Sequence, residues 1–524
     1  MPIGIDLIKS QSGLSYRIRQ LKNCKMSPPR MFFGNELKAI LPELFLLLGV
    51  STLLLLGVEY STSKKQGYPV VVKSITWMTA FTCLLGLLLV MNNPFQSILL
   101  FNNMLVHDPF TNLVKAILLM TTAACLLVSF EYIKVKKLHA FEFSLLMLFS
   151  IIGSMVVVSS YDLLTLYLGI EMSSLCLYAL AAFTRRSAFS TEAGLKYFIL
   201  GAFASGILLF GMSLIYGLTG TTNFEDLAKI LVGAYESDLI IPNGLTVGVI
   251  FVAAALLFKS TAAPFHMWAP DVYEGAPTIV STFFAVVPKM AILGLFVRLF
   301  MYSFHDLASA WQQIILISAV LSMVVAAFTA LTQRKIKRFL AYSSIGHVGY
   351  LLIGLGTATV EGIQGLLLYT LIYVVMTLNA WTFVLSSEFG SKEGRAVYFT
   401  DLIGLGKINP LLAITFACTL LSMAGVPPLA GFLSKMYVFF SAMQGGIYLV
   451  AFIGVLSSVV GAFYYLRFIK IIYFEKASTL TSFKAMTREQ SVILGVTFLF
   501  IVLLFLSPTP LLTMTHKMAL SLIL

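Results

Sequence analysis

The sequence has few charged residues for its length. Asp, Glu, Lys and Arg make up 11% of the 524 residues, whereas a soluble domain carries about 25%. Hydrophobic residues make up 59% of the chain, and the mean hydropathy is +0.92. This balance excludes a soluble globular protein and predicts a polytopic membrane protein.

Cysteine is also scarce, and nucleotide-binding motifs are lacking. None of the five cysteines lies within a few residues of another, so no pair has the spacing of a metal or iron–sulfur site. No GxGxxG opens a helix, and there is no Walker loop and no Cys–His nucleophile pattern. We therefore expect no catalytic redox site, no cofactor site and no metal site in this chain.

Long apolar runs are abundant. No run alternates with period two, which a membrane β-barrel would require. At about 20 apolar residues per span, the chain should form about fourteen transmembrane helices and an all-α fold. The expected helix cores are 39–58, 74–91, 111–130, 141–160, 163–183, 193–217, 244–264, 277–300, 311–331, 339–356, 362–386, 409–441 (long and interrupted), 449–472 and 490–507.

The net charge of +12 gathers in alternate loops. Lys and Arg cluster at 64–65, 134–137, 185–186, 334–338, 392–407 and 476–488, and the intervening loops are nearly free of them. This positive-inside pattern explains the basic balance without a nucleic-acid partner and predicts an even number of spans. The basic segment 1–38 is the exception, since it should lie on the opposite face. It lacks the apolar core of a secretory signal, so we expect a disordered extension or, as an alternative, an organellar presequence.

Four ionisable residues interrupt the apolar runs: Glu171, Lys259, Lys289 and Lys435. A charge at the bilayer centre costs at least ~2.5–3.5 kcal/mol on insertion scales, so such residues usually mark a functional path. Glu171 could instead cap a neighbouring helix, and Lys259 could extend to the membrane surface. Lys289 lies near the middle of its span, so its ammonium group cannot readily extend to the membrane surface. We expect all four to line a proton pathway.

Prolines break two of the apolar runs beside these charges. Pro264 follows Lys259 by five residues, and Pro427 and Pro428 shortly precede Lys435. Proline leaves a backbone carbonyl unpaired, which is tolerated at membrane depth only beside a cavity or a neighbouring helix. Two lysines beside two breaks suggest a pair of inverted five-helix repeats, formed by spans 4–8 and 9–13.

Two further residues are weaker candidates. Lys196 could be a relay residue, but Glu192 one turn earlier explains it nearly as well as a helix-surface ion pair. His347 follows two serines at helical spacing, and it could either relay protons or be a satisfied buried histidine. Arg298, near a helix end, should anchor its helix at the membrane surface. Sodium would need several oxygen ligands, and lysines predominate here, so we expect protons as the cargo.

Five segments resemble subunit 2 of the proton-translocating NADH:ubiquinone oxidoreductases (respiratory complex I), and the resemblance covers about residues 35–524. These segments are LLTLYLGIEMSSLCLYALAAF, STEAGLKYFILGAF, FKSTAAPFHMWAPDVYEGAPT, QRKIKRFLAYSSIGHVGYLLIGL and AGVPPLAGFLSKMYVFF. The sequences of these segments most resemble those of the plant or protist mitochondrial form of this subunit. The resemblance implies a multi-pass subunit of the mitochondrial inner membrane, with other membrane-arm subunits, including antiporter-like neighbours, and lipids as partners. It implies that NADH, FMN, the iron–sulfur clusters and ubiquinone belong to partner subunits.

The resemblance also implies roles for individual residues. Glu171 and Lys259 would form a tuning ion pair, Lys289 would be the central relay, and Lys435 would be the exit-side lysine. His347 would lie on the hydrophilic axis between the two halves. The implied division is a basic extension (1–34), helices 1–3 (35–140), two repeats (141–300 and 301–473) and helix 14 with its tail (474–524).

Two alternatives remain open. The same architecture occurs in multisubunit cation/proton antiporters, in which the chain would act without a redox partner. The chain could also be a structural membrane subunit without a proton path of its own.

Overall fold

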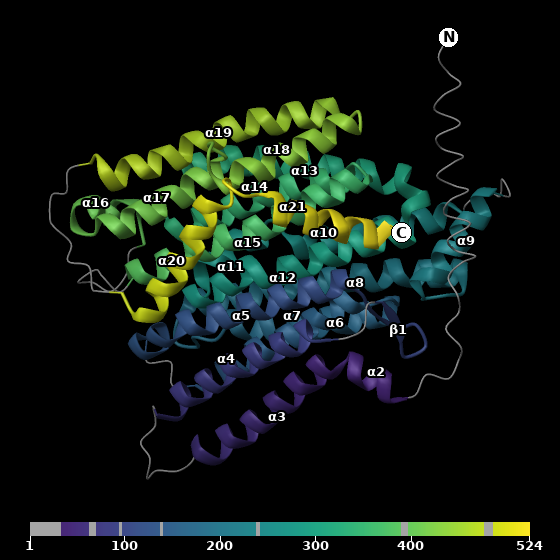
Figure 1. Ribbon diagram of the computed structural model, residues 1–524, viewed down its shortest axis with the longest axis horizontal. Helices are drawn as coiled ribbons and strands as arrows, with labels where there is room; N and C mark the ends of the chain where they lie inside the picture. Colours follow the sequence, from purple (N-terminus) through teal and green to yellow (C-terminus); the bar gives the residue numbers. More distant parts are fainter. Residues whose placement is uncertain are drawn as a thin grey trace.

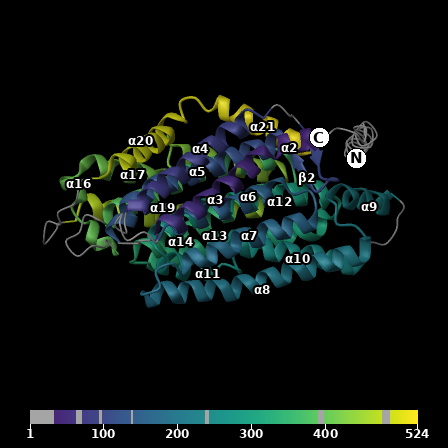
Figure 2. The same cartoon turned by 90° about the horizontal axis from the view of Figure 1, so that it is seen from below.

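The computed structural model describes residues 33–61, 70–93, 97–136, 140–236, 242–388, 397–475 and 486–523. Residues 1–32 of the predicted basic extension lie outside this described part. The described chain is a bundle of long helices that run side by side (Figure 1). Its first spans form one edge and the late helix α19 (Tyr448–Tyr473) forms the opposite edge, while two C-terminal helices lie across another face (Figures 1 and 2).

The elements follow one another along the chain in three groups. The N-terminal group is α2 (Phe33–Ala39), α3 (Leu41–Ser61), α4 (Val70–Met91), β1 (Ile98–Leu100), β2 (Leu105–His107) and α5 (Pro109–Val135). The middle group is α6 (Glu142–Ser159), α7 (Leu163–Ala181), α8 (Ala188–Thr219), α9 (Phe224–Glu236), α10 (Asn243–Ser260), α11 (Trp268–Gly275) and α12 (Thr278–Arg298), followed by η1 (Leu299–Ser303) and η2 (His305–Leu307). The last group is α13 (Ala308–Thr332), α14 (Ile336–Gly356), α15 (Val360–Glu388), η3 (Phe399–Leu402), α16 (Leu405–Ile408), α17 (Pro410–Ala424), α18 (Ala430–Gln444), α19, α20 (Arg488–Leu503) and α21 (Thr509–Ile523).

The predicted all-α membrane fold is confirmed. Twelve helices of the described chain are long and apolar enough to cross a membrane. The remaining two predicted spans correspond to the interrupted pair α17 and α18 and to the 16-residue α20. One two-stranded antiparallel hairpin, β1 with β2, is the sheet found in the described residues. The helices α9 and α21 were not predicted. α9 is short and amphipathic, and α21 follows a proline-containing turn, so neither forms a long apolar run.

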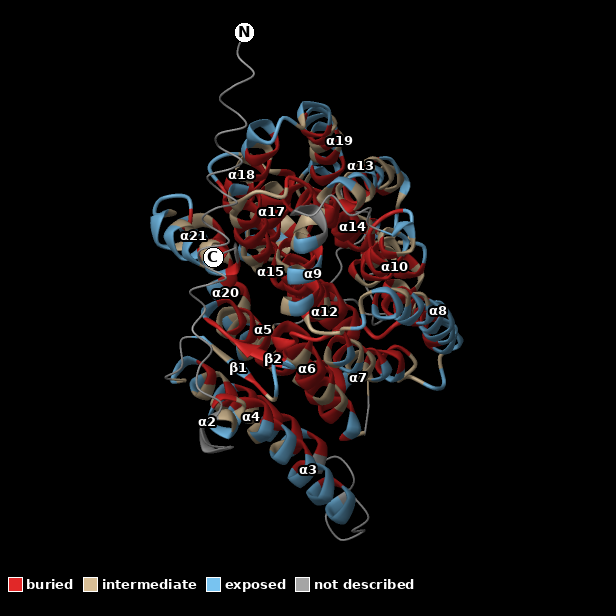
Figure 3. Ribbon diagram, turned by 90° about the vertical axis from the view of Figure 1, so that its right-hand side faces the viewer, coloured by how far each residue is buried: buried red, intermediate tan, exposed pale blue. Residues whose placement is uncertain are grey.

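The most buried helices lie at the centre of the bundle. About nine-tenths of the spans of α12, α14 and α15 is buried, against about a third of α3. Figure 3 shows these central helices in red behind the more exposed outer ones. Two candidate residues, Lys289 and His347, lie on α12 and α14. The protein itself therefore keeps them away from lipid.

Both predicted helix breaks are present. Between α10 and α11, Thr261 adopts a left-handed conformation (φ 70°) and Pro264 follows; between α17 and α18, Gly425 does so (φ 86°) before the two prolines. Neighbouring helices satisfy the freed backbone groups, as the absence of water in lipid requires. On α13, Ser318 donates to the Ala263 carbonyl, and Ser322 accepts from the Ala263 amide, both at 2.8 Å. The division into two inverted repeats stays a prediction.

Candidate proton pathway

Four helices supply the predicted pathway residues. Glu171 lies on α7, Lys259 at the end of α10, Lys289 in the middle of α12 and Lys435 on α18. Lys289 and Lys435 are buried, with 2% and 7% of their surface exposed, whereas Glu171 and Lys259 are half-buried. The sequence predicted that these ionisable groups are buried within the bundle. The structure confirms this burial for Lys289 and Lys435.

Lys259 is hydrogen-bonded to a tyrosine on the helix that carries Glu171. Glu171, Ser174 and Tyr178 share one face of α7, since they are three and four residues apart. The Lys259 ammonium donates to the Tyr178 hydroxyl at 3.2 Å and lies 5.7 Å from the centre of its ring. These two described side chains, Glu171 and Lys259, do not form an ion pair within 4.0 Å, although the Glu171 charge acts on the lysine. Their coupling is therefore longer in range than the ion pair that the resemblance implies.

A small cavity extends from Lys259 toward α12. It has a volume of about 20 Å³, and its wall includes Ser154, Ser174, Lys259 and Pro288. One water needs ~10–15 Å³ and two or more polar partners, so this cavity has room for one. Oε1 of Glu171 is buried without a hydrogen-bond partner in the structure, which is typical of a group that water satisfies. On α12 the cavity reaches Pro288, Ala291 and Ile292, one residue short of Lys289 in the sequence.

Lys289 places a buried charge in the middle of α12. Its ammonium donates to the hydroxyl of Ser344 on α14 at 3.0 Å and lies 5.6 Å from the centre of the Tyr273 ring. Among the described residues, no carboxylate comes within ion-pair distance of it. An unpaired ammonium in a low-dielectric site responds strongly to any change of charge nearby. Lys289 can therefore gain or lose a proton when the charges around it change.

His347 lies one turn beyond Ser344 on α14 and has a hydroxyl partner at each ring nitrogen. Nδ1 lies 2.8 Å from the hydroxyl of Tyr369 on α15, and Nε2 lies 3.3 Å from that of Tyr465 on α19. The Tyr465 hydroxyl also bonds to Ser343. The histidine thus joins hydroxyl groups from three helices, which is the arrangement a proton relay needs.

Lys435 caps the C-terminal end of α17, the first half of the broken helix. Its ammonium donates to the carbonyl of Ala424, the last residue of α17, at 2.9 Å, and it lies 4.9 Å from the centre of the Tyr350 ring. A cation at a helix C-terminus is stabilised by the unpaired carbonyls there. A cavity of about 10 Å³, whose wall includes His347, Tyr350 and Lys435, lies between the histidine and the lysine. A second cavity, of about 270 Å³, opens on the other side of Lys435 between apolar side chains of α18 and α19.

Lys196 lies apart from this buried row. Its ammonium pairs with Glu192 at 2.8 Å, as the helical spacing indicated, and also with Asp271 of α11 at 2.9 Å. Asp271 in turn accepts from Arg338 of α14 at 2.7 Å. The side chain of Lys196 is 40% exposed. It therefore belongs to a surface network that ties α8, α11 and α14 together at the basic ends of these helices.

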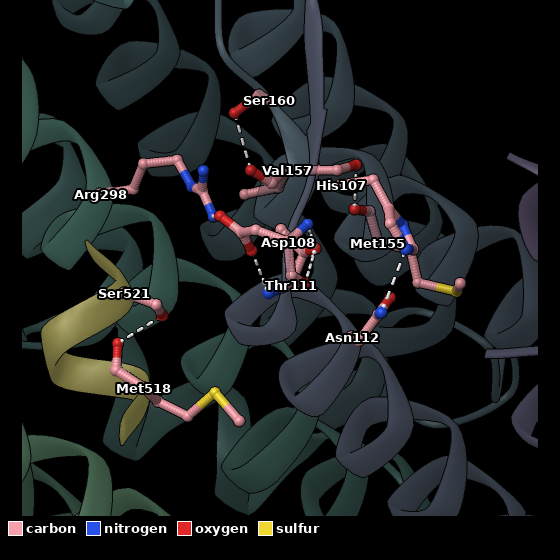
Figure 4. A network of polar contacts seen from close by, with 11 residues as sticks. His107, Asp108, Thr111, Asn112, Met155, Val157, Ser160, Arg298, Met518 and Ser521 are labelled. Carbon is pink, nitrogen blue, oxygen red and sulfur yellow. Dashed lines mark hydrogen bonds and ion pairs between the residues drawn. The ribbon is translucent and has the colours of Figure 1, made fainter. Parts of the chain in front are cut away.

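The structure corrects the expectation for Arg298. It is not a surface anchor, because only 3% of its surface is exposed and its guanidinium pairs with Asp108 at 2.7 Å (Figure 4). A second buried pair, Glu43 with Lys115 at 2.5 Å, joins α3 to α5 and was also missed. Both of its members lie within predicted spans, so the rule that singled out Lys289 could have found them. The tyrosines of the relay carry no comparable signal in the sequence.

Comparison with known proteins identifies the family of the chain. Residues 160–461 match the family model described as the transmembrane region of NADH:quinone oxidoreductases and Mrp antiporters. The chain is 50% identical over 493 residues to NADH-ubiquinone oxidoreductase chain 2 of Marchantia polymorpha, covering 94% of this chain and 99% of that protein.

Two solved structures share the fold. A chain of respiratory complex I from Thermus thermophilus is 29% identical and superposes with a TM-score of 0.75, covering 90% of this chain and 98% of that one. A chain of the Mrp complex from Dietzia, 18% identical, superposes with a TM-score of 0.78 over 93% of this chain and 98% of that one, and shows a common fold only. The predicted family is thus confirmed: the chain belongs to the NADH:quinone oxidoreductase/Mrp antiporter family of membrane subunits, in the group of NADH-ubiquinone oxidoreductase chain 2.

Proposed function

We propose that this chain translocates protons across the mitochondrial inner membrane as a membrane-arm subunit of NADH:ubiquinone oxidoreductase. The observation that carries the proposal is the row of Lys289, Ser344, His347 and Lys435 through the buried centre of the bundle. Each of these side chains can donate or accept a proton. One cavity with room for a water lies at Lys259, and another, of about 10 Å³, lies between His347 and Lys435. A row of exchangeable groups linked by water is the physical requirement for proton transfer.

The charges along the row would set the order of events. When Lys259 becomes more strongly coupled to Glu171, its positive charge acts less on Lys289, and Lys289 binds a proton more readily. When that coupling weakens, repulsion between the two ammonium groups favours release of the proton from Lys289 toward Ser344 and His347. His347 can accept it at one ring nitrogen and release a proton from the other, because both nitrogens face hydroxyl groups. Lys435 would receive it at the far end.

Electron transfer would take place in partner subunits. We propose that NADH, FMN, the iron–sulfur clusters and ubiquinone are all bound there, and that other antiporter-like membrane subunits and lipids surround this chain. Proton movement here would follow from charge changes transmitted by those neighbours.

A sodium/proton antiporter is the second candidate, favoured by the common fold with the Mrp chain. Sodium binds to clusters of oxygen ligands, whereas Glu171 is the one carboxylate among the four charged residues of the proposed path and the other three are lysines. The lysines favour protons. Co-purification of the chain with flavin- and iron–sulfur-containing partners would support the oxidoreductase, and sodium-dependent transport without such partners would support the antiporter. A purely structural subunit is the third reading.

The test is the Lys289→Ala variant in the intact complex, reconstituted into lipid vesicles. We expect the complex to assemble and NADH-driven acidification of the vesicles to be lost or strongly reduced. The matched control is Lys229→Ala on α9, which removes an exposed lysine paired with Glu225 and should pump like the wild type. Unchanged pumping by Lys289→Ala would refute the relay and support a structural subunit.

A further inference from the structure

A buried ion pair lies at the C-terminal end of α12, the helix that carries Lys289. Arg298 is the last residue of α12, nine residues after Lys289, and Asp108 is the N-cap of α5. Figure 4 shows the Arg298 guanidinium extending to the Asp108 carboxylate, which lies beside Thr111 at the start of α5. Both residues lie at the membrane face opposite the basic loops. The proposed pathway uses neither of them.

The pair holds two permanent charges. Burial raises the pKa of the Asp108 carboxyl, but the Arg298 charge and the hydrogen bonds from Thr111 and Arg298 outweigh it and hold the pKa below its ordinary value. Arginine stays protonated in proteins. The two helix ends also stabilise the charged forms, because a carboxylate is favoured at the start of α5 and a cation at the end of α12. Neither group can therefore exchange a proton near neutral pH.

No polar side chain lies on α12 between Lys289 and Arg298. Residues 290–297 are apolar and buried, and they separate the two Cα positions by ~13.5 Å of helix. The surroundings of Arg298 differ. Nε of Arg298 and Oγ of Ser303, five residues later, are buried without hydrogen-bond partners in the structure. Such groups normally bind water, so hydration from this face would reach Arg298 and end there.

The two charged side chains are both buried, Arg298 more completely than Asp108. The Arg298 side chain is 4% exposed and that of Asp108 is 13% exposed. Along the chain, Arg298 follows directly after the apolar stretch and precedes Ser303, so its charge stands between the two. A fixed guanidinium repels protons and other cations, as it does in water-selective pores.

We propose that the Asp108–Arg298 pair is a proton seal, which prevents protons from leaking along α12 between Lys289 and the membrane face opposite the basic loops. This inference rests on the proposed function, because a seal matters only if Lys289 lies on a proton path. Loss of the pair should therefore uncouple NADH oxidation from proton translocation, although neither residue transfers a proton itself.

The test measures passive proton leak in vesicles that contain the intact complex, with an imposed pH gradient, a pH-sensitive dye inside and no NADH. The main variant is Arg298→Gln with Asp108→Asn, which keeps a hydrogen-bonded pair of similar shape and leaves no unpaired buried charge. We expect its leak to rise on the order of tenfold, the factor that corresponds to 1.4 kcal/mol. Arg298→Lys retains the charge and should stay as tight as the wild type. Lys229→Gln on the same face is the control and should also stay tight.

Two results would overturn the seal. One is an assembled neutral-pair complex with wild-type leak, which would make the pair a structural clamp only. The other is a leak that persists after Lys289→Ala is added to the neutral pair, because the leak would then bypass Lys289. Failure of the proposed function is read separately, as unchanged NADH-driven pumping by Lys289→Ala in a complex that keeps the Asp108–Arg298 pair.

Discussion

The buried pair of Glu43 and Lys115 offers a quantitative prediction about the first three spans. Nζ of Lys115 lies 2.5 Å from Oε1 of Glu43, and the side chains are 5% and 7% exposed. Neither carboxylate oxygen has a hydrogen-bond partner besides this contact. Lys115→Met therefore leaves a buried charge uncompensated, which destabilises a protein by about 3–5 kcal/mol. This corresponds to a roughly 150- to 5,000-fold change in the folding equilibrium.

The double variant Glu43→Gln with Lys115→Met should recover most of that loss, because replacing both charges removes the desolvation penalty together with the attraction. The measurement is the free energy of unfolding of the purified chain in mixed micelles, titrated with SDS and followed by tryptophan fluorescence. Lys229→Met, which breaks an exposed pair, should change it by only about 0.2–1 kcal/mol. The reasoning is wrong if the single Lys115 variant stays within about 1 kcal/mol of the wild type, or if the double variant is as unstable as the single one.

Three further predictions concern the pathway and its surroundings. Gly425→Ala should reduce proton pumping, since a Cβ there would lie 2.9 Å from Cδ of Lys435 and the φ of 86° is strained for any residue but glycine; wild-type pumping would contradict this. Lys196→Met should leave the proton-to-NADH ratio unchanged, because Lys196 belongs to the surface network, and a loss as large as that of Lys289→Ala would place it on the path instead. The stability contributed by Asp108 should be complete above its ordinary pKa near 4 and disappear only as the pH falls through the lower native value; unfolding measured between about pH 5 and about pH 8 should therefore differ from that of Asp108→Asn by a constant amount.

Much of the fold follows from the sequence, because each span is a run of apolar residues of membrane-spanning length. The breaks follow as well, since Pro264 and the pair Pro427 and Pro428 remove donors within such runs. The helices α9 and α21 could not be predicted in this way. They pack one apolar side against the bundle and keep polar residues on the other, so their mean hydropathy does not mark them.

The site was predictable residue by residue but not as a set of contacts. Lys289 stands out in any hydropathy profile, yet its partner Ser344 is 55 residues away, and serine in a transmembrane helix is unremarkable by itself. Tyr178 is 81 residues from Lys259. Arg298 lies near a helix end, and this position predicted that it would reach the membrane surface. Its partner in the buried ion pair, Asp108, lies 190 residues earlier. Only packing of the helices brings such groups together.

The central claim is that Lys289 and Lys435 lie on one proton path joined through His347. The most direct test is the proton-to-NADH ratio of reconstituted complexes with Lys289→Ala, Lys435→Ala and both substitutions together. Residues that act in series are non-additive, so the double variant should pump as many protons as the worse of the two single variants. If the two single losses instead add up in the double variant, the lysines lie on separate paths and the account is wrong.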